Sequence, residues 1–187
     1  MSRFERRETP PQFEDYRQYR PFLRRDFSYR CAYCERAEAI LGGDESFEID
    51  HHRPAAKFPE FVGHYPNLYY SCGRCNRHKS NTWPSGGLIA VGFRFADPCQ
   101  EDMYSEHLQE MPDGQVRPLT NCGSYSCEHI RLNRPALLRW RQEKRRMAEQ
   151  LRALDHILAA AERDPGARDL VAAIKSLIAQ ERERLSL

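Results

Sequence analysis

The spacing of hydrophobic residues predicts helices toward both ends of the chain and short strands in between. Residues 1–11 show no regular pattern and are expected to be disordered or extended. Over residues 13–27 the apolar side chains recur every three or four positions, as on one face of a helix. Pro21 either splits this helix or starts a second one. Residues 35–41 fit a short helix that the two following glycines end.

The middle of the chain has features of short β-strands. Apolar and polar residues alternate over 46–50, residues 68–71 form a second strand-like run, and a helix is expected over 76–82. Strand, long loop, strand and helix make a compact ββα arrangement. A further strand is predicted over 88–95, and a hairpin over 108–119 whose arms meet at the turn sequence Pro-Asp-Gly.

The last third of the chain has the apolar period of amphipathic helices. Ser126 is expected to cap a short helix, and Asn133 to cap a long helix with Pro135 in its first turn. The sequence Asp-Pro-Gly at 164–166 breaks the pattern before a final helix. The last two helices are expected to pack as an antiparallel hairpin over 134–187, which completes an α+β fold.

Length and composition narrow the class of protein. A chain of 187 residues fits one domain, expected over 12–133, with a helical appendage. No apolar run is long enough to cross a bilayer, and the first residues lack the apolar stretch of a secretory signal, so we expect a cytoplasmic protein with no membrane contact. In that compartment, the 7 cysteines are expected to be thiols or metal ligands.

Charge is unevenly distributed although the net charge is only +2. Arginine-rich segments cover residues 1–30 and 131–152, whereas residues 86–130 are acidic. The two basic segments could face phosphate groups, although charged helices are more often only solvated surfaces.

Four of the cysteines form two Cys-x-x-Cys pairs, Cys31 with Cys34 and Cys72 with Cys75. This spacing allows two thiolates from one tight turn to reach one ion, and two such turns complete the tetrahedral shell that Zn²⁺ prefers. The alternatives are buried free thiols or a redox pair. Because four thiolates leave no open position, the predicted zinc is structural. The other three cysteines lack this spacing and are interpreted as small buried residues.

Asp50 and His51 stand together at the end of a predicted strand, and Asn76 follows the second cysteine pair. Side chains alternate along a strand, so Asp50 can hold a metal ion while His51 addresses a substrate beside it. A carboxylate and an amide oxygen are hard ligands suited to Mg²⁺ or Mn²⁺. Taken singly, each of these residues also has an ordinary structural explanation.

Residues 31–80 resemble the HNH endonucleases, the ββα-metal nucleases. The resemblance rests on the first cysteine pair, Asp-His-x-x-Pro at 50–54, Asn-Leu at 67–68 and Cys-x-x-Cys-Asn-x-x-Lys at 72–79. It implies a ββα-metal nuclease core with zinc knuckles over 31–82, flanked by helices and followed by the helical hairpin.

The resemblance also implies roles for single residues. His51 matches the general base, Asn67 the residue that braces the loop beyond it, and Asp50 and Asn76 the ligands of the catalytic Mg²⁺ or Mn²⁺. Pro54 favours His51 over His52 as the base, because the proline of the family follows the base by three positions. Lys79, Arg53 and Arg77 are expected to contact the nucleic acid.

These expectations add up to a metal-dependent endonuclease that hydrolyses DNA, rather than RNA, with a histidine base and one divalent cation. It could be the effector of a bacterial defence system, with an ATPase or sensor protein as partner, and a homodimer is left open. The alternative is a non-catalytic, zinc-stapled adaptor that binds nucleic acid or protein.

Overall fold

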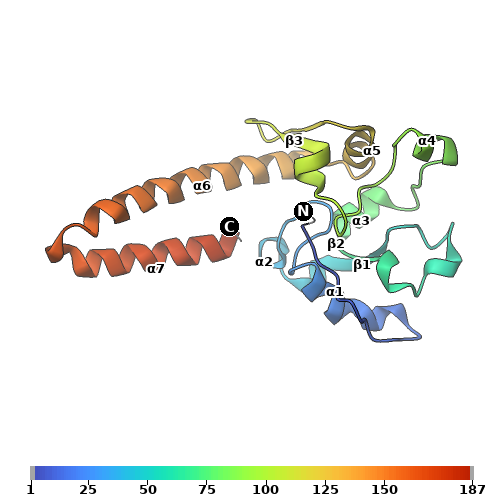
Figure 1. Ribbon diagram of the computed structural model, residues 1–187, viewed down its shortest axis with the longest axis horizontal. Coiled ribbons are helices and arrows are strands. Elements are labelled where there is room, and N and C mark those ends of the chain that lie inside the picture. Colours follow the sequence, from blue (N-terminus) through green and yellow to red (C-terminus); the bar gives the residue numbers. More distant parts are fainter. Residues whose placement is uncertain (1–2, 186–187) are drawn as a thin grey trace. The chain divides into compact units, whose positions relative to one another are not determined.

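The computed structural model describes residues 3–185 (Figure 1). Contacts divide this range into two compact units, one that ends at Leu137 and one that begins at Leu138. The fold is a mixture of helices and two small two-stranded sheets, which confirms the predicted α+β class.

The first unit begins with an extended segment that packs into the core. Phe4 is only 2% exposed, and the Arg6 guanidinium donates to the carbonyl oxygens of Tyr65 and Leu68 at 3.2 and 2.9 Å. Of the two expectations for this segment, disordered or extended, the structure shows the extended one, which Phe4 and Arg6 anchor to the core. The sequence pattern concealed this because the segment has no helical or strand period.

The helical region that follows is split at its proline. A 3₁₀ turn, Tyr16–Tyr19, leads into α1, Arg20–Asp26, with Pro21 in the first turn of α1. A proline there needs no intrahelical hydrogen bond, so it starts the second helix. The next helix, α2, spans Glu38–Leu41 and ends at Gly42, whose φ of +89° is the left-handed cap that glycine favours.

Two strands and a helix then form the centre of the unit. Strand β1, Phe47–His51, pairs antiparallel with β2, Leu68–Cys72, so that Asp50 lies opposite Tyr69. Helix α3, Gly73–Lys79, follows β2 directly. It begins three residues before the predicted start at Asn76, because Cys72 is its N-cap and Cys75 lies in its first turn.

The segment expected as a strand over 88–95 is instead a short helix, α4, Gly86–Ala90. The Ser85 hydroxyl caps it by accepting from the Leu88 amide, and Gly92, with φ of +88°, turns the chain after its end. Local capping therefore overrides the apolar run in this sequence.

The predicted hairpin is confirmed as β3, Leu108–Glu110, paired with β4, Val116–Pro118, after a π-helical turn over Met103–His107. Helix α5, Asn121–His129, starts earlier than expected, with Thr120 as its cap. Ser126 is buried and accepts from the Ala96 amide, and the Asn133 side chain bonds the backbone of Val116. Both predicted caps therefore have other roles.

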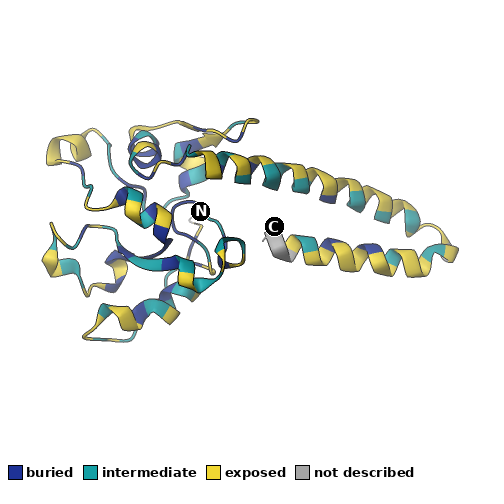
Figure 2. Cartoon of the chain, turned by 180° about the vertical axis from the view of Figure 1, so that it is seen from behind, coloured by how far each residue is buried: buried dark blue, intermediate teal, exposed yellow. Residues whose placement is uncertain are grey.

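The second unit consists of the long α6, Pro135–Ala161, from Leu138 onward, a 3₁₀ turn, Pro165–Ala167, and α7, Arg168–Leu185. Leu151, Ile174 and Ile178 form its core. The two helices run side by side in opposite directions, and most of their surface is exposed or half-buried (Figure 2). Residues 186 and 187 of the predicted hairpin lie outside the described residues. Among those described, no helix combines the length and the apolar composition needed to cross a membrane.

Candidate metal centre and active site

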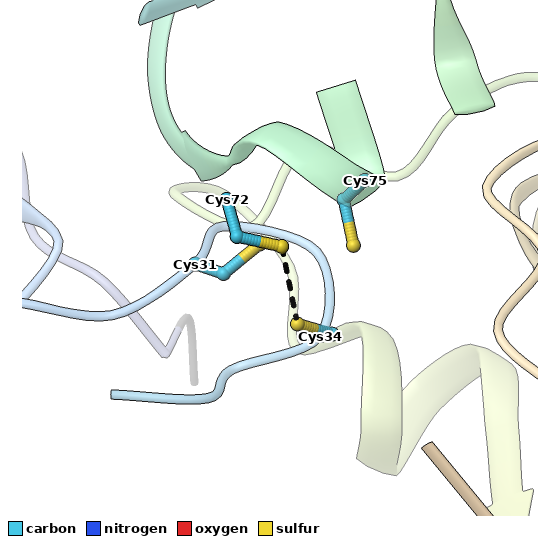
Figure 3. A group of neighbouring side chains, drawn as sticks. All are labelled: Cys31, Cys34, Cys72 and Cys75. Carbon is cyan, nitrogen blue, oxygen red and sulfur yellow. Dashed lines mark hydrogen bonds between the residues drawn. The ribbon is translucent and has the colours of Figure 1, made fainter. Parts of the chain in front are cut away.

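Four cysteines converge in the first unit, and we call Cys31, Cys34, Cys72 and Cys75 the cysteine cluster. Their Sγ atoms all lie within 4.8 Å of one another and all four residues are buried. The first pair lies on the turn between α1 and α2, Cys72 ends β2, and Cys75 lies in α3 (Figure 3). Residues far apart in sequence therefore present four sulfur atoms to one point.

The geometry of the cysteine cluster fits a tetrahedral metal. Zinc–sulfur bonds of about 2.3 Å in a tetrahedron place the sulfur atoms about 3.8 Å apart, and the Sγ atoms of Cys34 and Cys72 are 3.9 Å apart. Burial raises the pKa of Cys31, whereas hydrogen bonds from the neighbouring thiols lower that of Cys34. The Arg134 guanidinium lies 3.1 Å from Cys75 Sγ and can offset thiolate charge. The cluster could hold a structural metal such as zinc.

A second feature is a cavity of about 250 Å³ beside the end of β1, which we call the His51 cavity. It is lined by residues from β1, the loop after it and α3: Ile49, Asp50, His51, Pro54, Ala55, Asn76, Arg77, Ser80 and Asn81. Asp50, His51 and Asn76 thus reach one space, as the sequence predicted for a carboxylate, an imidazole and an amide.

The imidazole of His51 is held by the backbone. Its Nε2 lies 3.1 Å from the carbonyl oxygen of Val62. A carbonyl only accepts, so Nε2 carries a proton, and in the neutral form of the ring Nδ1 keeps its lone pair. Tyr16 packs edge-on against the ring, with centroids 4.8 Å apart. These two contacts fix the orientation of a side chain that can accept a proton at Nδ1.

Asp50 lies in a buried polar network at the base of the His51 cavity. It is 4% exposed, its Oδ1 accepts from Lys79 Nζ at 3.0 Å, and its Oδ2 accepts from the Tyr33 hydroxyl. Burial raises the pKa of Asp50 and lowers that of Lys79, and each partner opposes the shift of the other. The ammonium also donates to the His51 carbonyl at 2.6 Å.

Lys79 therefore does not occupy the position expected of a residue that contacts nucleic acid. Its side chain is 0% exposed and lies 5.6 Å from the centroid of Phe95. This corrects the predicted phosphate contact: the spacing along α3 turns Lys79 inward, where it neutralises Asp50. Arg53 and Arg77 are exposed, and Arg77 lines the His51 cavity, so their contact with nucleic acid stays a prediction.

Asn76 is oriented by an acidic residue that the sequence analysis overlooked. Its Nδ2 donates to Glu48 Oε2 at 2.7 Å, which leaves Oδ1 as the amide atom for a ligand. Glu48 stands two positions before Asp50 on β1, on the same face of the strand. That alternation is the signal in the sequence that would have identified it. Tyr33, inside the first cysteine turn, carried no such signal.

Asn67 cross-links the loop that follows His51. Its Oδ1 accepts from the Arg53 amide at 2.8 Å, and its Nδ2 lies 3.1 Å from the Arg53 carbonyl and 3.2 Å from that of Phe61. The carbonyl that holds His51 belongs to Val62, the next residue. The geometry is that of a brace, and the catalytic importance of Asn67 stays a prediction.

His52 is placed quite differently from His51. Its ring lies 4.8 Å from that of Tyr69 and 5.3 Å from that of Trp83, outside the His51 cavity. Burial, with Lys79 and nearby arginines, lowers the pKa of His52 to about 3. Of the two adjacent histidines, only His51 reaches the cavity of Asp50 and Asn76.

Comparisons of the sequence with models of known protein families and with curated proteins found no match.

Proposed function

We propose that this protein is a metal-dependent endonuclease that hydrolyses DNA phosphodiester bonds. One observation carries the proposal: an imidazole whose Nε2 is engaged by a backbone carbonyl, so that Nδ1 is the nitrogen left to accept a proton, lines the same cavity as a carboxylate and an amide oxygen. The order of strand, strand and helix that brings them together supports the resemblance to the ββα-metal nucleases.

In the proposed reaction, His51 Nδ1 takes a proton from a water molecule whose oxygen forms a bond to the phosphorus while the bond to the 3′ oxygen breaks. The Val62 carbonyl holds the ring during this transfer and stabilises the imidazolium that results. Asn67 keeps the loop in place.

The donor set beside His51 fits a hard divalent cation. The two oxygens of Asp50 have lone pairs beyond those used by Lys79 and Tyr33, and Asn76 offers Oδ1. Asp50 and Asn76 would hold Mg²⁺ or Mn²⁺, which would supply charge stabilisation for the leaving oxygen. A zinc ion in the cysteine cluster would be structural, because four thiolates close its shell.

The exposed Arg53 and Arg77 flank this chemistry and are the residues we propose to hold the DNA backbone. Such contacts make binding weaken as salt is raised. A non-catalytic adaptor remains the second candidate, favoured by one observation: both carboxylate oxygens of Asp50 already have protein partners.

The test is cleavage of plasmid DNA with Mg²⁺ or Mn²⁺ by the wild type and by His51→Ala, with RNA as a second substrate. Loss of a general base lowers the rate by about 10²- to 10⁴-fold, whereas loss of the bond to Val62 lowers stability by only about 1 kcal/mol. The exposed His156 in α6 provides a matched control, since His156→Ala should cut at the wild-type rate. Equal cutting by both variants would overturn the assignment of His51 as the general base. Binding of DNA without cutting under every metal would favour the adaptor.

A further inference from the structure

The first unit contains a second cavity, of about 430 Å³, which shares no lining residue with the His51 cavity. We call it the His52 cavity. The side chains that matter for its chemistry are His52, Arg53, Tyr69, Trp83, Arg94 and Phe95. It is larger than the His51 cavity, and the proposed reaction does not use it.

The wall of the His52 cavity is largely aromatic. The ring of Trp83 lies 5.3 Å from His52 and 6.3 Å from Phe95, and His52 lies 4.8 Å from Tyr69. The Arg53 guanidinium lies 4.9 Å from the centroid of Phe61, which also lines the cavity. Flat rings and a guanidinium plane offer faces on which a planar ligand can stack.

Two polar atoms of this wall are buried and make no well-formed hydrogen bond among the described residues, although the Asp97 carboxylate, which also lines the cavity, is close enough to one of them to raise the pKa of Tyr69. They are the Tyr69 hydroxyl and His52 Nδ1, and Tyr69 is 0% exposed. A buried polar group left unpaired destabilises a fold by about 1–3 kcal/mol, and such groups in folded proteins normally have a partner. The Tyr69 hydroxyl and His52 Nδ1 therefore indicate a ligand with hydrogen-bonding atoms on its edge.

The charges that line the His52 cavity favour a neutral ring, and not a phosphate, as the ligand group inside it. Both terminal nitrogens of Arg94 bond Glu101, at 2.5 and 2.7 Å, so this arginine is neutralised. Arg53 is exposed and lies over Phe61, where it can reach a phosphate outside. Ring faces for stacking, polar atoms in the wall and an exposed guanidinium beside them are the features that would recognise a nucleotide.

We infer that the His52 cavity receives an unstacked nucleobase. The inference rests on the proposed function in so far as the base belongs to the nucleic acid that is cut. His51 and His52 are consecutive, and Asn67 both lines the His52 cavity and braces the loop whose end holds His51. A base in this cavity would thus contact the same loop that positions the proposed general base.

The experiment uses the full chain and two kinds of probe. The four nucleoside monophosphates test free nucleotides by calorimetry, and oligonucleotides that contain 2-aminopurine, single-stranded and duplex, test a base within a strand by fluorescence. Binding of either probe at micromolar to low millimolar concentration supports the cavity, and the probe that binds identifies the source of the base. No binding of any probe overturns the inference.

The decisive variant is Tyr69→Phe, which removes the hydroxyl but keeps the ring. Affinity should fall about tenfold, the effect of one lost hydrogen bond, while the melting temperature stays the same or rises because an unpaired buried hydroxyl is gone. Tyr125→Phe is the matched control, a buried tyrosine outside the cavity, and should bind as the wild type does. Wild-type affinity in Tyr69→Phe overturns the inference.

Failure of this inference and failure of the proposed function are separable. His51→Ala should still bind the probes, because the His52 cavity is intact. Probe binding in a wild type that cuts no DNA defeats the nuclease proposal alone. Cutting by a wild type that binds no probe defeats the nucleobase cavity alone.

Discussion

The cysteine cluster and the His51 cavity share one element, α3, yet they differ in their chemistry. Cys75 and Asn76 are neighbours on α3, where successive side chains point about 100° apart, so one joins the cluster and the other the cavity. The cluster is buried and its four thiols are equivalent donors. The cavity is open, and Asp50, His51 and Asn76 are different donor groups that are each held by a different residue.

The comparison shows how the two sites depend on the fold. The cluster needs only that two turns meet, because four identical ligands complete one shell. The His51 cavity needs oriented groups, and the orientation comes from residues outside it: Val62 for His51, Glu48 for Asn76, and Lys79 for Asp50. We therefore expect changes at the cluster to affect folding and changes at the cavity to affect its chemistry.

The largest expected effect is the loss of one cysteine ligand. Cys72→Ser should lose the bound metal and destabilise the first unit by about 5 kcal/mol or more, because metal binding in such sites is coupled to folding. Removal of metal from the wild type with a chelator should have the same effect. Near-ultraviolet circular dichroism measures the loss of tertiary structure, and atomic emission measures the loss of metal.

Cys99→Ser is the control for this change, since Cys99 is a half-buried thiol outside the cluster. It should retain the metal and change stability by less than about 1 kcal/mol, as most substitutions away from special features do. If Cys72→Ser has the same melting temperature and the same metal content as Cys99→Ser, the cluster does not stabilise the fold.

The next effect concerns the buried ion pair beneath the His51 cavity. Lys79→Met leaves Asp50 buried without its cation, and such a change costs about 3–5 kcal/mol. The double variant Asp50→Asn with Lys79→Met removes both charges and should recover more than half of the loss, as measured by urea unfolding.

Lys57→Met, at an exposed lysine in the loop after β1, should leave stability unchanged. If Lys79→Met is as stable as this control and only binds DNA less tightly, Lys79 contacts nucleic acid after all, and the buried pair is not the dominant feature of this site.

The sequence predicted the cysteine cluster and the residues of the His51 cavity, but not the buried position of Lys79, and the reason is physical. The repeated Cys-x-x-Cys spacing predicted the cysteine cluster. The strand-end position of Asp50 and His51, together with the resemblance to the HNH endonucleases, predicted their roles beside Asn76. The burial of Lys79 depends on which side of α3 meets β1, and no local pattern contains that information. For the same reason the sequence leaves open whether the segment around Phe4 is disordered or extended, and its packing into the core is known only from the structure.

Local sequence patterns also failed to predict some of the secondary structure. The apolar run over 88–95 fits a strand, but the Ser85 cap decides for a helix. Thr120, not Ser126, caps α5, since Ser126 is buried. Several residues in a segment can cap a helix. A side chain that already makes a tertiary hydrogen bond is not available as the cap.

The smallest expected effect tests whether the two sites are coupled. Tyr33 lies between Cys31 and Cys34, and its hydroxyl donates to Asp50, so it is a direct link between the cysteine cluster and the His51 cavity. Tyr33→Phe should keep the metal and lower stability by only about 1–2 kcal/mol, because Asp50 retains Lys79 as a partner. If the link positions Asp50 for the proposed reaction, cleavage should fall severalfold at unchanged metal content. The exposed Tyr29 offers the control Tyr29→Phe, and identical cleavage and stability in the two variants would show that the sites act independently.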